Sequence, residues 1–377
     1  VILTFLVYNE FMIIAEIGTS HEGSLEKAKK LIDAAVLANA DFIKFQWVYA
    51  SEILHPNTGK VNLPTGDISL YDRFLQLECP YSFYEELKKY VHSKGKKFIC
   101  SPFGLKSLDE LLSINPDAIK IASPELNHFK MLEHLAKFRS TQKEKIPVIL
   151  SSGVSTLSDI EKALSILGTE NISLLHCVTS YPAPEDDYNL RVIENLSRIF
   201  NIPCGVSDHS LDPILVPALS IACGGTIVEK HITLSKDTLG LDDPVALEPE
   251  QFALMSHIVN QSLASIRHYG KEIGSKRIIE QLSEECGIKK INSIIGTGIK
   301  KLADSEKENY GRTNRSLHYM NSFKKGHTIL EKDISILRTE KILSPGISPE
   351  FYDILIGKTL SKDVQNGDGV LLADFLS

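Results

Sequence analysis

The stretch GGTIVEKHITL, from Gly224 to Leu234, begins as an apolar strand and then places three ionisable residues in a row. These residues are Glu229, Lys230 and His231. Buried charge is costly unless it is paired or bound to a metal, so an apolar strand with this ending needs an explanation. We interpret the stretch as a core strand whose end enters an active site.

Seven further short apolar runs occur along the chain, and amphipathic segments with helical periodicity separate most of them. Continuous apolar strands that alternate with helices are typical of parallel strands covered by helices. Eight such units over about 250 residues predict a (β/α)8 TIM barrel. The alternative, a doubly wound open sheet, is disfavoured because no strand is followed by a GxGxxG turn. The predicted strands begin at residues 12, 41, 97, 118, 147, 172, 204 and 226.

The chain of 377 residues is long enough for two domains. We interpret its apolar start as a lead-in to the first strand rather than a signal peptide, because it lacks a basic segment and a small-residue cleavage site. Residues 272–311 are charged and weakly periodic, which is typical of a connector. We predict a catalytic barrel over residues 1–296, a linker over 297–311 and a small β-rich module over 312–377.

Composition narrows the possible partners. A formal net charge of −7 argues against general nucleic-acid binding, although a few local cations can still bind a small anionic substrate. The six scattered cysteines form no CxxC pair, which favours a reduced, cytoplasmic protein. No apolar run reaches the length of a membrane span, so we expect no membrane partner.

Nearly every predicted strand ends in a polar residue. In a TIM barrel the active groups lie at the carboxyl ends of the strands, so these residues are expected to converge on one rim. The predicted rim comprises Glu16, Lys44, Gln46, Ser101, Lys120, Ser123, Glu125, Ser151, Ser152, His176, Thr179, Ser207, Asp208, His209, Glu229, Lys230 and His231.

Two histidines of this rim, His209 and His231, end neighbouring predicted strands. Their imidazoles are therefore predicted to meet at one divalent cation, Mn²⁺ or Mg²⁺ in preference to a closed structural zinc. Such an ion polarises a carbonyl group. The alternative is that each histidine is an ordinary hydrogen-bonded residue.

Lys44 and Lys120 supply positive charge at the same rim. Lysines with hydroxyl and backbone donors form a phosphate cradle. Two alternatives stay open: Lys120 extends to solvent, or either lysine forms a Schiff base. The hydroxyl groups that would complete the cradle belong to Ser101, Ser123, Ser151 and Ser207.

Glu16 and Glu125 are candidate acid–base groups or hydroxyl binders, with an ion pair to a nearby lysine as the alternative. Strict strand alternation would place Lys120 and Glu125 on opposite faces. Both reach one site only if the strand ends near Ala122, which Pro124 favours.

The motifs IIAEIGTSHEG, DFIKFQ, IKIASPE, ILSSGVST, GVSDHS and VEKHITL occur in an order that resembles the sialic acid (N-acetylneuraminate) synthases, members of the nonulosonic acid synthases. The resemblance runs from about Ile13 to Glu250. It resumes over residues 305–317 and 329–360, the second of which is similar to an antifreeze-like (SAF) domain.

The resemblance implies condensation of phosphoenolpyruvate with the open aldehyde of an N-acylated amino sugar, such as N-acetylmannosamine, and release of phosphate. It implies a divalent metal, Mn²⁺ or alternatively Mg²⁺ or Co²⁺, and a domain-swapped homodimer. The implied roles are metal binding by His209 and His231; phosphate binding by Lys120, Ser151 and Ser207; lining of that pocket by Lys44, Gln46, Ser123 and Thr179; sugar contact or proton transfer by Glu16, Glu125, Tyr181 and Asp242; and entry of Arg338 into the partner's barrel.

The sequence departs from the family pattern at Pro124 and Thr179, which touch the sugar and phosphate pockets, and in a longer segment after Arg338. The acceptor is therefore left open among N-acetylmannosamine, its 6-phosphate and bacterial diamino sugars. Two other functions are considered. One is a metal-dependent barrel aldolase or isomerase acting on a sugar phosphate, and the other is an inactive barrel that binds carbohydrate or ice.

Overall fold

The computed structural model describes residues 11–63, 66–238 and 240–376, and eight parallel strands form a closed barrel at its centre. The predicted TIM barrel is thereby confirmed. Around the barrel the order is β1-β10-β9-β8-β7-β6-β5-β2, with β2 paired to β1. The barrel strands are β1 (Met12–Gly18), β2 (Phe42–Trp47), β5 (Lys97–Pro102), β6 (Ala118–Ile121), β7 (Val148–Ser151), β8 (Ile172–Cys177), β9 (Cys204–Asp208) and β10 (Ile227–His231).

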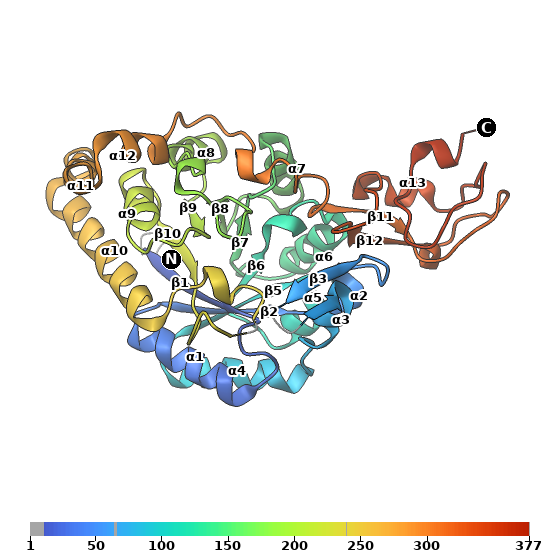
Figure 1. Ribbon diagram of the computed structural model, residues 1–377, viewed down its shortest axis with the longest axis horizontal. Coiled ribbons are helices and arrows are strands. Elements are labelled where there is room, and N and C mark those ends of the chain that lie inside the picture. The colour runs from blue at the N-terminus through green and yellow to red at the C-terminus, as the bar shows by residue number, and fades with distance from the viewer. Residues whose placement is uncertain (1–10, 64–65, 239, 377) are drawn as a thin grey trace.

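Helices surround the strands, as Figure 1 shows. Each presents an apolar stripe to the barrel, because residues three and four apart share one face of a helix. The Thr156 hydroxyl accepts a hydrogen bond from the Asp159 amide at 3.3 Å and so caps α7. The surrounding helices are α1 (Leu25–Leu37), α4 (Tyr81–Ser93), α5 (Leu105–Ser113), α6 (Phe129–Ser140), α7 (Leu157–Leu167), α8 (Val192–Phe200), α9 (Leu215–Ala222) and α10 (Pro249–Tyr269).

Two helices occupy most of the segment that we predicted as a connector, so that prediction was wrong for residues 272–295. They are α11 (Lys271–Cys286) and α12 (Ile288–Ile295). Their buried stripe is narrow, formed mainly by Ile278, Leu282 and three isoleucines of α12, and charged residues cover the other faces. A narrow stripe leaves little periodicity to detect, although it is enough to pack α11 on α10.

The long segment after β2 forms α2 (Ala50–Ile53), the hairpin strands β3 (Lys60–Leu63) and β4 (Gly66–Ser69), and α3 (Leu70–Leu75). Its apolar side chains, with Phe103 from the loop after β5, form a separate cluster. Besides Phe103, the buried members of this cluster are Val48, Ile53, Leu54, Leu70 and Leu77.

The C-terminal module pairs β11 (Arg315–Tyr319) with β12 (Ile334–Arg338) in an antiparallel sheet and has its own apolar core. In Figure 1 it lies at one edge of the barrel, in red, beside α6. Near the end of this module, which we predicted to be β-rich, residues 372–374 form a 3-10 helix. The boundaries of the barrel, linker and module stay a prediction, as does the SAF character of the module.

The predicted lead-in falls on residues 1–10, outside the described residues. Among the residues that are described, no helix is both long enough and apolar enough to cross a membrane.

Candidate active site

The barrel strands carry an apolar layer inside the barrel and a polar layer immediately above it. The apolar layer consists of Ile14, Ile99, Ala118, Ile149, Leu175 and Ile227. Side chains two residues apart on a strand point the same way, so the next inward positions lie above this layer, toward the carboxyl ends. These positions are polar in almost every strand. They hold Glu16, Lys44, Ser101, Lys120, Ser151, Cys177, Ser207 and Glu229.

The same alternation explains the row of charges at the end of β10. Glu229 and His231 point into the barrel, and Lys230 points outward. The Lys230 ammonium lies 2.6 Å from the Asp208 carboxylate, and both side chains are fully buried. Lys230 and Asp208 therefore form a structural ion pair outside the barrel, and only their neighbours in sequence face the site.

His176, which we predicted on the rim, also points outward. It follows the inward Leu175 by one residue, and its Nε2 atom lies 2.5 Å from the carbonyl of Tyr188. The inward residue at the end of β8 is Cys177, whose Sγ lies 3.7 Å from Nδ1 of His209. The sequence analysis did not single out this cysteine, because a thiol in an apolar strand is usually a small core residue.

Glu229 is the centre of the polar layer. Its Oε1 atom lies 3.3 Å from the Lys120 ammonium and 3.6 Å from that of Lys44, and it accepts a 2.9 Å hydrogen bond from Ser207. Burial raises the pKa of the carboxyl, but the two lysines and the hydroxyl outweigh it and lower the pKa to about 2. Glu229 is therefore ionised and holds both ammonium groups at one place.

The two lysines have further partners inside the barrel. Lys120 donates a 2.7 Å hydrogen bond to Ser151, and Lys44 forms an ion pair with Glu16. Burial lowers the pKa of Lys44 to about 8, with Glu229 opposing the shift. The hydroxyl of Ser101 is buried and has no hydrogen-bond partner among the described residues, which is the environment expected of a group that binds a ligand.

His209 and His231 lie side by side above this layer, with ring centroids 5.5 Å apart. Nδ1 of His209 lies 2.9 Å from the Val178 carbonyl, so that Nε2 faces the Tyr181 hydroxyl at 3.2 Å. Nδ1 of His231 is buried, has no hydrogen-bond partner in the part of the chain that the structure describes, and lies 4.0 Å from the Asp242 carboxylate. Burial and the neighbouring His209 hold the pKa of His231 well below its ordinary value, so its imidazole is neutral.

A neutral buried imidazole with an unpartnered nitrogen fits a metal ligand. The described residues include no group of three or more histidine, cysteine or carboxylate side chains arranged to hold a metal. The pair therefore fits an ion that takes its remaining ligands from substrate or water, rather than a closed structural site.

β6 ends at Ile121, and a 3-10 helix, η1 (Ser123–Glu125), follows it. This early end resolves the alternation problem that the sequence posed at Lys120. The Ser123 hydroxyl accepts a 3.0 Å hydrogen bond from the Gly153 amide. A β-carbon on Gly153 would lie only 2.0 Å from the Thr179 hydroxyl oxygen, so the loops after β6, β7 and β8 meet closely here.

Glu125 is fully buried and bound by two arginines of the C-terminal module. Arg315 approaches one carboxylate oxygen at 2.5 Å, and Arg338 approaches the other at 2.6 Å. Burial alone would raise the pKa of Glu125, but the two guanidinium groups lower it. The ion pair that we considered as the alternative role of Glu125 is therefore present, although its partners are arginines rather than a lysine. A role of Glu125 in proton transfer stays a prediction. Arg315 was missed, because arginines are usually exposed and nothing in the strand pattern around this one predicts that it is buried.

A cavity of about 300 Å³ lies above the polar layer, between the barrel loops and the module. Its polar lining includes Gln46, Thr179, Tyr181, Asp242 and Arg338, all of which the sequence analysis proposed. One wall is apolar and is formed by Phe74, Leu77, Phe103, Ala122, Pro124 and Leu241.

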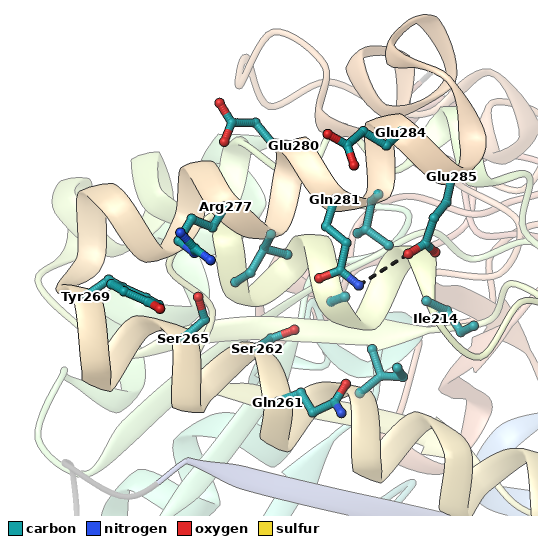
Figure 2. Close-up of a pocket in the computed structure, with 14 residues that line it drawn as sticks. Ile214, Gln261, Ser262, Ser265, Tyr269, Arg277, Glu280, Gln281, Glu284 and Glu285 are labelled. Atoms are coloured by element: carbon teal, nitrogen blue, oxygen red, sulfur yellow. Dashed lines mark hydrogen bonds between the residues drawn. The ribbon is translucent and has the colours of Figure 1, made fainter.

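A second cavity, of about 480 Å³, lies between α10 and α11 and contains none of the predicted site residues. In Figure 2, Gln281 points from α11 toward α10, whereas Glu280 points away. Arg277 stacks on the Tyr269 ring at 4.3 Å, and Gln281 donates to Glu285 at 3.2 Å. These side chains contact one another rather than pointing at a shared ligand position, so we place the candidate active site inside the barrel.

Fold and site together define a (β/α)8 barrel with an ionic site at the carboxyl ends of its strands. A family model described as the NeuB family matches residues 31–271. The chain belongs to the NeuB family.

Relatives match nearly the whole chain, the C-terminal module included. An N,N'-diacetyllegionaminic acid synthase of Campylobacter jejuni is 30% identical over 366 residues, which cover 95% of this chain and 98% of that protein. A pseudaminic acid synthase of the same species is 31% identical over 372 residues and 96% of each chain. The crystal structure of the spore coat polysaccharide biosynthesis protein SpsE of Bacillus subtilis matches with a TM-score of 0.76 at 29% identity, covering 98% of this chain and 96% of that one.

Proposed function

We propose that the chain is a nonulosonic acid synthase that condenses phosphoenolpyruvate with an N-acylated amino sugar and releases inorganic phosphate. The observation that carries the proposal is the buried polar layer, where two lysines and several hydroxyl groups lie directly below a pair of histidines. The lysines and hydroxyl groups suit an anionic donor, and the histidines above them suit an aldehyde that a metal ion polarises. The names of the relatives support the same reaction class.

The phosphate and carboxylate of the donor would bind in the polar layer. Lys120 and Ser151 are already joined by a hydrogen bond, and Lys44 shares the Glu229 carboxylate with Lys120. An incoming anion would take over donors that the carboxylates now hold. Because these groups are fixed before binding, little reorganisation is needed when charge develops on the leaving phosphate.

We propose that His209 and His231 hold a divalent metal, with Mn²⁺ the first candidate. When bound, such an ion supplies Lewis acidity toward the sugar aldehyde. The Val178 carbonyl fixes the orientation of the His209 ring, and Asp242 lies within reach of His231. Tyr181 and Asp242 stand at the same place and are candidates for holding a sugar hydroxyl or moving its proton.

The cavity above the layer favours an uncharged acceptor. Its cation, Arg338, is bound to Glu125, while Asp242 and Glu340 add negative charge to its lining. The phosphate of an acceptor in this cavity would meet these carboxylates, and among the described lining residues the one cation, Arg338, is already bound to Glu125, which disfavours the 6-phosphate. The apolar wall at Pro124 and Phe103 suits acyl and deoxy methyl groups.

We also propose a cytoplasmic homodimer in which the modules are exchanged. Within a single chain, Arg338 already contacts Glu125 of its own barrel at 2.6 Å. In an exchanged dimer the partner's module would make this contact instead.

The test is incubation with phosphoenolpyruvate, Mn²⁺ and a panel of N-acylated amino sugars, followed by phosphate release and product mass. We expect sugar-dependent release and a product heavier than the sugar by the pyruvyl unit. His231→Gln should abolish release, whereas His134→Gln, a partly exposed histidine on α6, should not. Absence of release with every acylated sugar contradicts the proposal, and release that continues without sugar points to a different reaction.

A further inference from the structure

A buried carboxylate outside the barrel holds two loops of the candidate site. Glu306, at the end of the 3-10 helix η4 (Asp304–Glu306), is only 1% exposed. Its Oε1 atom accepts hydrogen bonds from the amides of Val154 and Thr179, each at 2.7 Å. Its Oε2 atom accepts one from Ala303 at 3.2 Å. One oxygen thus joins the loop after β7 to the loop after β8.

Neighbouring side chains of the same segment bind the carbonyl groups of these loops. We call residues 300–314 the linker strap. Polar side chains bound to loop backbone are costly to remove, because the buried backbone groups would lose their partners. The additional bonds are Lys300 to the Ser152 carbonyl at 2.9 Å, Asn309 to the Thr179 carbonyl at 3.2 Å and Asn314 to the Val154 carbonyl at 2.9 Å.

The loop that Glu306 holds is strained. Val154 has a φ of +42°, in the left-handed region that β-branched residues rarely adopt. Such a conformation persists only where surrounding contacts impose it. Glu306 and Asn314 bind the amide and the carbonyl of this residue, so the linker strap supplies the contacts.

The conformation of the loop after β7 affects the position of the hydroxyl groups that are proposed to bind the anion. Gly153 donates to Ser123 at 3.0 Å and leaves no room for a β-carbon beside the Thr179 hydroxyl. Ser151, which binds Lys120, lies two residues before Gly153. A shift of either loop would therefore displace the hydroxyl groups of Ser123 and Thr179, which meet around Gly153, and would disturb the strand end that carries Ser151.

We propose that Glu306 is a positioning residue for the phosphate-binding part of the site. Its side chain is long enough to bind the loops after β7 and β8 at once and so fixes them relative to each other. This inference rests on the proposed function, because it assigns phosphoenolpyruvate as the anion. Phosphate binding by the barrel would then depend on docking of the linker strap, which follows the last barrel helix in sequence.

Two conservative substitutions distinguish the effect of the length of the Glu306 side chain from the effect of its charge. Glu306→Gln keeps the length and the oxygen that accepts both amides, and it changes only the atom that faces Ala303. Glu306→Asp keeps the charge but shortens the side chain by one methylene, so that it no longer reaches both loops. Glu308→Asp, an exposed glutamate of the same strap, is the matched control. Neither change at Glu306 leaves a large cavity, so both chains should fold.

The measurement is the Kd of phosphoenolpyruvate by calorimetry, with the melting temperature recorded for every variant. We expect Glu306→Asp to weaken binding by about tenfold or more, the effect of losing hydrogen bonds to a charged group. Glu306→Gln and Glu308→Asp should stay within about threefold of the unaltered chain.

The outcomes are distinct. An unaltered chain that does not bind phosphoenolpyruvate contradicts the proposed function. If it binds, an Asp variant with an unchanged Kd overturns the inference, even when its melting temperature falls, because the residue is then only structural. Equal weakening in both variants, or a weaker Gln variant alone, also overturns it, since charge rather than reach would then matter.

Discussion

Glu229 and Glu16 hold the two lysines of the site in place. The Lys44 ammonium is bound to Glu16 and lies 3.6 Å from Glu229, and all three side chains are buried. Burial lowers the pKa of Lys44, and the negative charge of Glu229 opposes that shift. Glu229 therefore favours the cationic form of Lys44, although it is itself negative.

Lys44 predicts how binding depends on pH. With its pKa lowered to about 8, the side chain is a cation below that pH and neutral above it. Affinity for phosphoenolpyruvate should therefore be full below pH 8 and fall as pH rises through it. The check is the Kd of phosphoenolpyruvate on both sides of this value. Lys44→Arg keeps its charge over the whole range and should flatten the alkaline fall, and an unaltered chain without the fall contradicts the assignment.

At the scale of elements, the end of β7 depends on a glycine. Gly153→Ala would place a β-carbon 2.0 Å from the Thr179 hydroxyl and 2.9 Å from that of Ser123. We expect the loops to separate, with stability lower by roughly 1–3 kcal/mol and weaker binding of phosphoenolpyruvate. Thermal melts and calorimetry measure the two effects.

The control for this prediction is Gly95→Ala. Gly95 has a φ of +71° but nothing within 4 Å of the added atom, so it tests strain without a clash. It should lower stability and leave binding unchanged. Normal binding in the Gly153→Ala variant would show that the close meeting of the loops is not required.

All eight barrel strands could be predicted from sequence, because each is a continuous apolar run between helices. Most of the inward polar layer could be predicted, but Lys230 and Asp208 were wrongly placed on the rim. Strand alternation turns both side chains away from the site, where they form an ion pair. Alternation was misapplied at β8, where His176 was included and Cys177 was not. The roles of Glu306 and Arg315 could not be predicted, because their partners lie more than a hundred residues away in sequence.

At the scale of the whole molecule, Arg315 fastens the module to the barrel. Its side chain is fully buried and donates to Glu125 at 2.5 Å, to the Glu52 carbonyl at 2.5 Å and to the Phe103 carbonyl at 2.6 Å. All three nitrogens of this buried guanidinium donate hydrogen bonds, which makes docking specific, because any displacement leaves unpaired groups. The module can therefore complete only a barrel that presents these partners.

Complementation tests whether that barrel belongs to the same chain. A chain with Arg338→Ala keeps an intact barrel, and a chain with His209→Ala keeps an intact module. If modules are exchanged in a dimer, unfolding and refolding the two inactive chains together should restore part of the phosphate release. A chain carrying both substitutions, mixed with the Arg338→Ala chain, should restore none. No rescue in the first mixture would mean that each module serves its own barrel.

The apolar layer below the polar residues has one more consequence. Ile14, Ile149 and the other members of that layer seal the barrel from beneath, so the reacting groups can be reached from the loop side alone. If the proposed reaction takes place here, the compound that binds against the lysines would have to enter before the one that occupies the upper cavity. The apolar side chains at the bottom of the barrel would then impose an order of substrate binding.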